Sequence, residues 1–338
     1  MIVSWMTTNR CNLKCKHCYQ DAEGTDASIE EELTTAEGKA LIDQIVRAGF
    51  KIMIFSGGEP LLRDDIFELV AHAASKGLRP VFGTNGMLIT PEVARRLKEA
   101  GAAAMGISLD SLDECKHNEF RGDQDAYRLT LEGMKHCREV GLPFQIHTTI
   151  MDWNQGELLD VIDFAVKQGA QAHYPFFLIP VGRGKYIAET SIKVLENEEL
   201  IESIMQKSTE VPIGIKPTCA PQFVRIARQL GIEMRYTRGC LAGLTYCIIS
   251  PNGIVRPCAY MMEPAGDLRE QTFDDIWANS KLFKTLRTQA YDTPCGTCDY
   301  KDGCGGCRAR AAFYHDGNFM AADDYCAHGK KLLQETAN

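Results

Sequence analysis

The sequence lacks three features that would assign it to a membrane, a nucleic acid or the secretory route. No apolar run approaches the ~20 residues that a membrane-spanning helix needs, so we expect no membrane span. Basic residues are outnumbered 37 to 45, and the net charge of −8 excludes electrostatic binding of nucleic acid by the chain as a whole. Met1 leads into no secretory signal, which predicts a cytoplasmic protein.

Cysteine, in contrast, is abundant, with 14 residues in a chain of 338. Disulfides are disfavoured in a reducing compartment, so metal ligation is the better explanation for this abundance. Three cysteines lie within residues 11–18 and eight within residues 240–326, whereas Cys115, Cys137 and Cys219 stand apart. Structural thiols scattered through a core would not segregate in this way, so the two dense groups predict two metal-binding regions.

The first 180 residues alternate between short apolar segments of β type and helical patterns. The β-type segments are residues 2–7, 51–55, 80–83, 103–109, 144–150 and 172–178, and the helical patterns are residues 34–48, 66–75, 91–100, 126–140 and 158–168. Because parallel strands need crossover connections, this alternation predicts an α/β fold with a parallel sheet and helices outside it. Functional groups are then expected at the carboxyl ends of the strands.

The rest of the chain divides into a mostly helical bridge, residues 181–239, and a cysteine-rich part, residues 240–338. Within the cysteine-rich part, Pro251-Asn252-Gly253 separates two β-like runs, which predicts a hairpin over residues 246–256. One helix is expected over residues 273–288, followed by a loop-like tail. The predicted organisation is therefore a barrel domain over residues 1–180, the bridge, and a metal-binding extension.

Cys11-x3-Cys15-x2-Cys18 follows the first predicted strand directly. Three thiolates on a cube of four irons and four sulfides leave one iron without a protein ligand, and that iron can hold an exchangeable small molecule. The competing interpretation is a zinc site, which normally needs a fourth nearby ligand. His17 is the only local candidate, and it lies awkwardly between two of the cysteines.

This cysteine spacing is the signature of the radical S-adenosylmethionine (SAM) superfamily, which the first ~180 residues resemble. The resemblance implies a (β/α)6 partial TIM barrel in which the open iron binds the amino and carboxylate groups of SAM. Reductive cleavage of SAM then yields methionine and a 5′-deoxyadenosyl radical, which abstracts a hydrogen atom from the substrate. The strand-end residues that match the family's SAM contacts are Gly57, Gly58, Glu59, Thr84, Asn85, Ser108, Asp110, Arg121 and His147.

The resemblance also assigns roles within this set. Glu59 would pair with the ammonium of SAM, and Arg121 would bind its carboxylate. The Ser108–Asp110 segment and His147 would contact the ribose or adenosine. For each of these residues taken alone, a satisfied turn or a core polar group is the competing interpretation.

The C-terminal cysteines resemble the SPASM extension, which binds two additional four-iron clusters. Eight cysteines are the number that ligates two such clusters fully, which gives three 4Fe-4S clusters in all. The resemblance assigns auxiliary cluster I to Cys240, Cys247, Cys258 and Cys307. It assigns auxiliary cluster II to Cys295, Cys298, Cys304 and Cys326. Two residues separate Cys304 from Cys307, where many relatives have three, and two structural zinc sites are the alternative.

Further segments resemble the haem-biosynthesis branch of the superfamily, which contains haem b synthases, NirJ-like proteins and didecarboxysiroheme deacetylases. These segments are residues 173–185, 217–221, 237–243 and 304–311. The branch implies an iron-tetrapyrrole substrate, either iron-coproporphyrin or didecarboxysiroheme, and a low-potential electron donor such as flavodoxin or ferredoxin. A tetracarboxylate macrocycle needs aromatic walls and cationic rim groups. The candidates are His173, Tyr174, Phe176, Phe177, Arg183, Lys185, Lys216, Arg225 and Arg238.

Two of these features have plainer interpretations beside the functional ones. His173 is a candidate haem-iron ligand, although a core histidine explains it equally simply. Cys219 precedes a helical pattern, where a thiolate would be favoured, but a buried structural thiol is the simpler account. We expect Cys115 and Cys137 to be packing residues.

For a haem b synthase, the expected chemistry is oxidative decarboxylation of two propionates to vinyl groups. Hydrogen abstraction β to the carboxylate and loss of carbon dioxide leave one surplus electron, which an auxiliary cluster can accept. The rival enzyme class is a peptide maturase, which usually has an N-terminal peptide-recognition extension, whereas Met1 here leads straight into the first strand. The rival outside the enzymes is an iron–sulfur electron carrier or a zinc-binding interaction module, neither of which needs the strand-end polar residues.

Overall fold

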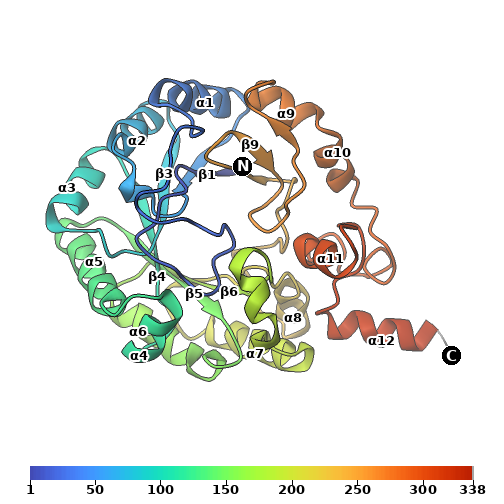
Figure 1. The fold of residues 1–338 in the computed structure, drawn as a ribbon. Coiled ribbons are helices and arrows are strands. Elements are labelled where there is room, and N and C mark those ends of the chain that lie inside the picture. Colours follow the sequence, from blue (N-terminus) through green and yellow to red (C-terminus); the bar gives the residue numbers. More distant parts are fainter. Residues whose placement is uncertain (337–338) are drawn as a thin grey trace.

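The computed structural model describes residues 1–336, and its centre is a curved parallel sheet with helices on the outer face (Figure 1). The α/β barrel predicted from the sequence is confirmed, and most strands and helices lie within one or two residues of their predicted bounds. The parallel strands are β1 (Ile2–Met6), β2 (Ile52–Ser56), β3 (Arg79–Thr84), β4 (Ala104–Ser108), β5 (Phe144–Ile150) and β6 (Ala172–Phe177). The helices are α1 (Thr35–Arg47), α2 (Ile66–Ser75), α3 (Pro91–Glu99), α4 (Glu114–Arg121), α5 (Ala126–Val140) and α6 (Leu158–Lys167).

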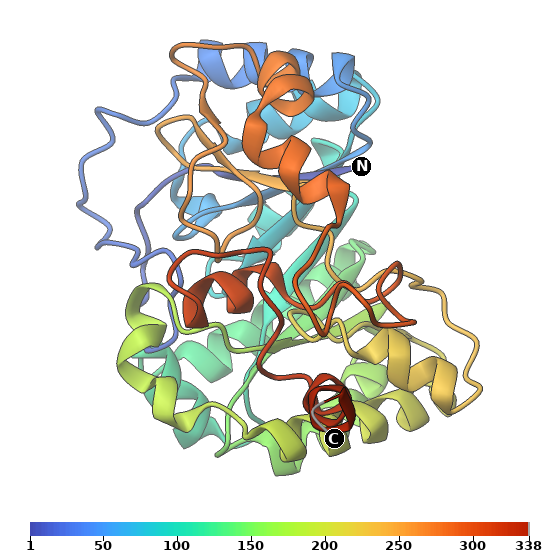
Figure 2. The same ribbon diagram turned by 90° about the vertical axis from the view of Figure 1, so that its right-hand side faces the viewer.

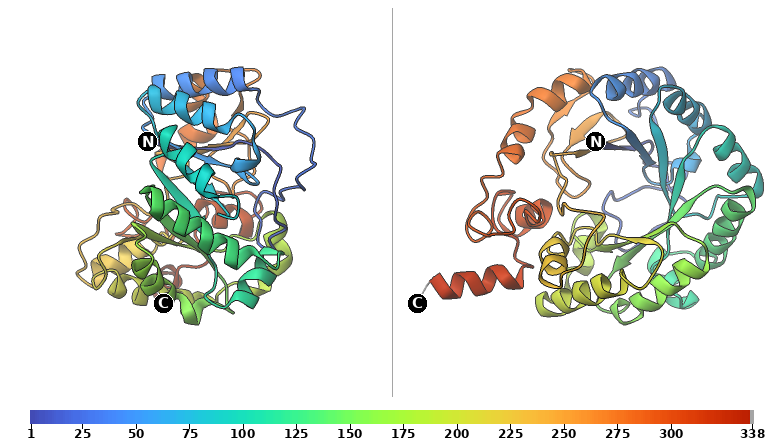
Figure 3. Two further views of the ribbon diagram at one scale, coloured as in Figure 1. Left: turned by 90° about the vertical axis from the view of Figure 1, so that its left-hand side faces the viewer. Right: turned by 180° about the vertical axis from the view of Figure 1, so that it is seen from behind.

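The sheet continues beyond this barrel on both sides, so that it contains ten strands in the order β10-β9-β8-β1-β2-β3-β4-β5-β6-β7. On one side β7 (Gly214–Ile215) runs parallel to β6. On the other side β8 (Tyr246–Ile249) runs parallel to β1 and forms the predicted hairpin with β9 (Ile254–Arg256), followed by β10 (Gly266–Asp267). The hairpin of the cysteine-rich part is thus hydrogen-bonded to the first strand of the barrel (Figure 3).

The packing of α1 on β1 shows how the outer face of the sheet is buried. Val3 and Trp5 point toward the helices and are fully buried, as expected when alternate residues of a strand face opposite sides. Gly38 of α1 allows a close approach, because a Cβ at this position would lie 2.6 Å from the Trp5 ring. The opposite face of β1 carries Ser4 and Met6, so the inner face of the barrel begins with a different set of side chains.

The helices correct two sequence predictions, because the single helix over residues 273–288 is wrong and the loop-like tail is wrong. Helix α4 within the barrel was not predicted. Ser280 divides the expected helix, because its backbone is extended (ψ 129°) and ends one helix where the next begins. The helices are α7 (Val194–Lys207), α8 (Phe223–Gln229), α9 (Phe273–Asn279), α10 (Lys281–Thr288), α11 (Arg308–Tyr314) and α12 (Ala327–Thr336). The short 3₁₀ segments are Pro60–Leu62, Gln155–Glu157 and Gly182–Thr190.

The segment from α9 to α12 runs along the open side of the curved sheet, from α1 at one end to α7 at the other (Figures 1 and 2). The division of the chain at residues 180 and 239 remains a prediction. Across residues 1–336, no helix is both long enough and apolar enough to traverse a bilayer.

A buried ion pair fixes α11 to the segment that follows it. Arg310 and Asp323 are 1% exposed or less, and their side chains approach to 3.3 Å. Asp323 also accepts hydrogen bonds from the Gln222 side chain and from the backbone N–H of Cys307, both at 2.8 Å. Helix α8, α11 and the C-terminal cysteine loop therefore meet at one carboxylate.

We expect Asp323→Ala to lower the free energy of unfolding by about 3–5 kcal/mol, because the change leaves Arg310 buried without a counter-charge. Denaturant unfolding of the anaerobically prepared chain measures the loss. Glu132→Ala, which removes an exposed pair with Arg128, is the matched control and should cost less than about 0.5 kcal/mol. Equal losses in the two variants would contradict a structural role for the buried pair.

Candidate active site and cluster sites

The loop after β1 holds the first three cysteines on the inner side of the barrel. Cys11 and Cys15 are buried, and Cys18 is partly exposed. The backbone N–H of Leu13 donates to Cys11 Sγ at 3.4 Å, and that of Ala22 donates to Cys18 Sγ at 3.5 Å. N–H···S hydrogen bonds of this kind surround cluster-ligating thiolates and tune the reduction potential. The three thiols therefore form a donor set that could hold an iron–sulfur cluster.

Two glycines at the end of β2 determine how closely this loop approaches the sheet. A Cβ at Gly57 would lie 2.6 Å from the carbonyl oxygen of Thr8, and one at Gly58 would lie 2.2 Å from that of Arg10. Gly57 also has φ +144°, in the region that favours glycine. The backbone N–H groups of Gly58 and Glu59 donate to Thr8 and Arg10, both at 2.8 Å. The Gly-Gly-Glu turn is therefore packed directly on the cysteine loop.

Glu59 is fully buried at the centre of a hydrogen-bond network. Its carboxylate accepts bonds from Thr84 Oγ1 at 2.8 and 2.9 Å and from the backbone N–H of Asn85 at 2.9 Å. Burial raises the pKa of Glu59 to about 7, although these hydrogen bonds oppose the shift. Burial raises the pKa of the Cys11 thiol, and the charge of Glu59 adds to this rise.

Arg121 lies on the other side of the cysteine loop, with Asp110 behind it. Arg121 Nε donates to the Asp110 carboxylate at 2.6 Å, and its Nη1 lies 3.9 Å from Cys15 Sγ. The second oxygen of Asp110 accepts the backbone N–H of Thr149 at 2.9 Å. Both oxygens of Asp110 are thus engaged within the protein, which makes Asp110 a positioning residue for Arg121. Its contact with ribose stays a prediction.

Aromatic side chains line the inner face of β5 and β6. The rings of Tyr174 and Phe176 lie 5.5 and 5.2 Å from the ring of His147, and Ser108 is paired in register with His147 on the adjacent strand. Burial, followed by the charge of Arg121, lowers the pKa of His147 to about 4, so this imidazole is neutral at pH 7. These residues give the barrel interior a largely apolar, aromatic wall.

Three substrate candidates predicted from the sequence do not face this interior. His173 alternates with Tyr174, so it lies on the helix side of the sheet, where Nε2 is 2.9 Å from Thr148 Oγ1. Arg183 binds the cysteine loop instead, with Nε donating to the carbonyl oxygen of Cys15 at 3.0 Å and Nη1 pairing with Asp21. Lys185 is exposed to solvent over the Tyr186 ring.

Two further arginines have partners elsewhere. Arg225 is paired with Glu198, and Arg238 donates to Gln289. Of the basic candidates, Lys216 is the one best placed to bind an anionic ligand. It is partly buried, its ammonium lies 5.5 Å from the centre of the Tyr236 ring, and no carboxylate within residues 1–336 forms a salt bridge with it.

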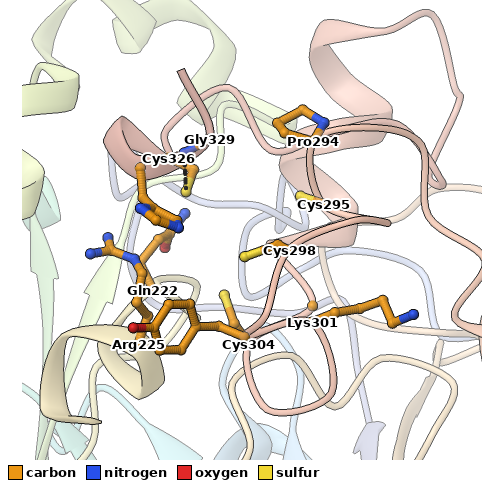
Figure 4. Close-up of a pocket in the computed structure, with 13 residues that line it drawn as sticks. Gln222, Arg225, Pro294, Cys295, Cys298, Lys301, Cys304, Cys326 and Gly329 are labelled. Carbon is orange, nitrogen blue, oxygen red and sulfur yellow. Dashed lines mark hydrogen bonds between the residues drawn. The ribbon is translucent and has the colours of Figure 1, made fainter. Parts of the chain in front are cut away.

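Four C-terminal cysteines line one pocket, together with residues of α8 and of the C-terminal segment. Figure 4 shows their side chains around this pocket: Cys295, Cys298, Cys304 and Cys326. Gly305 and Gly306 beside them have φ of +69° and +60°, and a Cβ at Gly306 would lie 2.4 Å from the Arg308 guanidinium. The pocket and its four thiols fit a cluster of several metal ions. Within residues 1–336, no three Cys, His, Asp or Glu side chains converge on a single-ion site.

The other C-terminal cysteines form a group that differs from the predicted one. Cys240, Cys258 and Cys307 pack in one small core and interact electrostatically. The fourth thiol that packs against that core is Cys219. Cys247 belongs to the main core between the sheet and its helices. The structure therefore brings together three of the four predicted residues and places Cys247 apart from them.

Three tyrosines were missed by the sequence analysis, and they lie between the first cysteine loop and this second group. The rings of Tyr19 and Tyr260 are 5.3 Å apart, and Tyr246 interacts with both Tyr19 and Cys258. Burial raises the pKa of each phenol well above its usual range. Tyr19 directly follows Cys18 and Tyr260 is two residues after Cys258, so their proximity to the cysteines was the available signal.

Comparison with known families assigns two regions of the chain. Residues 5–165 match the Radical SAM superfamily, and residues 240–299 match an iron–sulfur cluster-binding domain. The first region contains the cysteine loop, the Gly-Gly-Glu turn and strands β2 to β5, and it ends before the aromatic residues of β6. The second begins at Cys240 and ends after Cys298.

Similar proteins cover nearly the whole chain. An AdoMet-dependent heme synthase of Methanosarcina barkeri is 39% identical over 98% of this chain and 97% of its own length. An Fe-coproporphyrin III synthase of the same organism is 30% identical over 96% of this chain and 87% of its own length. Among solved structures, Streptococcus suis SuiB bound to the precursor peptide SuiA has a TM-score of 0.75 at 19% identity, covering 96% of this chain and 75% of that chain. This last similarity shows the shared fold.

The buried carboxyl of Glu59 should make stability depend on pH. Its pKa is raised in the folded state, so the folded chain holds this proton up to higher pH than the unfolded chain. Stability should therefore fall as pH rises from about 4.5 to about 7, by roughly 3 kcal/mol at most. Denaturant unfolding of ligand-free wild type and Glu59→Gln across this range tests the expectation.

The quantity to compare is the difference in unfolding free energy between the two proteins, because other groups titrate in the same range. The variant should gain stability relative to wild type as pH rises, since its side chain cannot ionise. Glu132→Gln, on the exposed face of α5, should show no such gain. A difference that stays constant with pH would contradict the raised pKa.

Proposed function

The chain belongs to the radical SAM superfamily, and we propose that it modifies side chains of an iron tetrapyrrole in haem biosynthesis. The observation that carries the proposal is the 39% identity to an AdoMet-dependent heme synthase over nearly the full length of both chains. The preferred reaction is oxidative decarboxylation of propionates of iron-coproporphyrin. Removal of side chains from didecarboxysiroheme is the related activity in the same branch.

The donor sets suit SAM and iron–sulfur clusters, and we propose three clusters of the 4Fe-4S type. Cys11, Cys15 and Cys18 would hold the SAM-binding cluster. Cys295, Cys298, Cys304 and Cys326 would hold auxiliary cluster II in the pocket that they line. When bound, the first cluster and SAM supply a 5′-deoxyadenosyl radical that abstracts a hydrogen atom. We expect a low-potential donor such as flavodoxin or ferredoxin to provide the electron.

The residues around the first cysteine loop would orient SAM by charge. Glu59 lies beside Cys11 and would accept the ammonium group, which favours its ionised form. Arg121, held by Asp110 beside Cys15, would bind the carboxylate from the other side. The glycines of the turn keep the backbone close enough to leave no room for water between the two segments.

The aromatic inner wall would receive the macrocycle. Tyr174 and Phe176 line one side of the barrel interior, and Tyr19 and Tyr260 lie nearer the second cysteine group. Lys216 would pair with a propionate, because a half-buried ammonium without a carboxylate partner is stabilised by an anionic ligand. Neutral His147 lies within this wall and would contact the substrate or adenosine without adding charge.

A peptide maturase remains the second candidate within the enzymes. The solved structure bound to a precursor peptide shares the fold, but its identity to this chain is 19%, half that of the heme synthase. An iron–sulfur electron carrier would not need Glu59 and Arg121 beside the cysteine loop. The product of the reaction distinguishes both rivals from the proposed function.

Anaerobic incubation of reconstituted enzyme with SAM, reductant and iron-coproporphyrin tests the proposal. We expect 5′-deoxyadenosine and a tetrapyrrole that has lost one carbon dioxide and two hydrogens for each propionate converted. Cys15→Ala should abolish both products, because the first cluster loses a ligand. Cleavage of SAM without a mass change in iron-coproporphyrin or didecarboxysiroheme would exclude the haem assignment.

Replacing Lys216 tests how the substrate is held. We expect Lys216→Met to raise the KM for iron-coproporphyrin about 10-fold or more, since a charge-assisted hydrogen bond contributes about 1.5–3 kcal/mol. Uncoupled SAM cleavage and the EPR spectrum of the reduced clusters should stay close to wild type. Lys185→Met removes the exposed lysine predicted from the sequence and should change the KM less than about twofold. The opposite ranking would assign the carboxylate contact to Lys185.

A further inference from the structure

The thiols around Cys307 define a four-cysteine site that differs from the one that the resemblance to the SPASM extension implies. Cys307 is buried in a small core against which Cys219, Cys240 and Cys258 pack. We propose that Cys219, and not Cys247, is the fourth ligand of auxiliary cluster I. The inference rests on the proposed function only in requiring that the C-terminal part binds iron–sulfur clusters.

The position of Cys219 is the first support. Its side chain packs against the small core that contains Cys307, as do those of Cys240 and Cys258. Its backbone adopts φ +61°, a conformation uncommon for a non-glycine residue. Arg310 Nη2 donates to the Cys219 carbonyl oxygen at 2.8 Å, and Arg310 is itself fixed by the buried pair with Asp323. The loop before α8 is therefore held so that this thiol meets the other three.

The strand that carries Cys247 is the second support, and it is independent of the first. β8 pairs with β1 in register, with Cys247 opposite Val3. Alternate residues of a strand face opposite sides, and Tyr246 lies on the inner side, where it interacts with Cys258. Cys247 therefore points outward, into the core formed by the sheet and its helices.

The surroundings of Cys247 agree with this direction. It is fully buried in the same core as Val3, Ile249 and Phe283, and this burial raises the pKa of its thiol. Turning this thiol inward would require a one-residue shift of β8, which would reverse every side chain of the strand. β8 is paired with a strand on each side, so it cannot shift without moving its buried side chains out of the core.

The assignment places two functions on one short loop. Lys216 lies three residues before Cys219, and its ammonium interacts with Cys219 and Cys240. A cluster bound by Cys219 would therefore fix the end of β7 and the lysine that we propose to bind a substrate carboxylate. The substrate and auxiliary cluster I would share one wall.

The test compares Cys219→Ala with Cys247→Ala in the full-length chain, reconstituted anaerobically. Wild type should contain about twelve iron ions per chain, and Cys219→Ala about four fewer. If the weakened cluster persists on three thiolates, its EPR spectrum should change on reduction and change again when an exogenous thiol is added. Cys247→Ala should keep wild-type iron content and EPR spectrum.

Two controls separate ligation from folding. Cys247→Val preserves the volume of the buried side chain better than alanine does and should also retain all the iron. Cys137→Ala removes another fully buried thiol of the same core and should behave as Cys247→Ala does. Far-UV circular dichroism and SAM cleavage by the first cluster show that each variant is folded.

Loss of iron from Cys247→Val, or a Cys219→Ala protein indistinguishable from wild type, would overturn the assignment. Wild type with only about four iron ions would also overturn it, together with the three-cluster proposal. The haem assignment is tested separately by the tetrapyrrole product. A failure of that assay in a protein with three clusters would leave the Cys219 result intact.

Discussion

The contact between the Gly-Gly-Glu turn and the cysteine loop is the constraint on which the site depends. Gly57 and Gly58 bring the end of β2 so close to residues 8–10 that any side chain there would collide with backbone. Glu59 is consequently placed beside Cys11 and buried away from water, where Thr84 and Asn85 hold it in one position. A longer separation between the turn and the cysteine loop would admit solvent. Water would then stabilise the carboxylate, which would no longer need a cationic ligand.

The first cysteine loop is also held from its other side. Arg121 lies beside Cys15 with Asp110 behind it, and Arg183 binds the loop carbonyl of Cys15. Glu59 thus lies in the turn that packs on this loop, whereas the guanidinium of Arg121 lies beside Cys15. This asymmetry suits a ligand that carries an ammonium and a carboxylate, and it is built from residues of four different strand–helix connections.

Periodic features of the fold were predictable from the sequence. Strand β5 and helices α2 and α5 have the predicted bounds, because their apolar residues recur with the period of the element. Helix α11 was missed, since Arg308 and Arg310 are buried and give no apolar period. The break at Ser280 was missed because it depends on the local backbone and interrupts no apolar pattern.

The sequence predicted that the site residues lie at strand ends, but it predicted the role of each residue less well. Glu59 and Arg121 could be found from their motifs, but the engagement of Asp110 by Arg121 and Thr149 depends on contacts between strands. Arg183 and His173 illustrate the same limit. Composition does not determine which loop an arginine binds, and it does not determine which face of a sheet a strand residue occupies. Cys247 was grouped with the other cysteines by the resemblance to the SPASM extension, whereas its direction follows from the register of β8 on β1.

The pairing of β8 with β1 has a mechanical consequence. β1 leads directly into the loop of Cys11, and the hairpin formed by β8 and β9 leads directly to Cys258. The two metal-binding regions are therefore mounted on adjacent hydrogen-bonded strands of one sheet, despite lying more than 200 residues apart along the chain. A displacement of one region would therefore shift the other, which keeps the separation between the Cys11 loop and Cys258 constant.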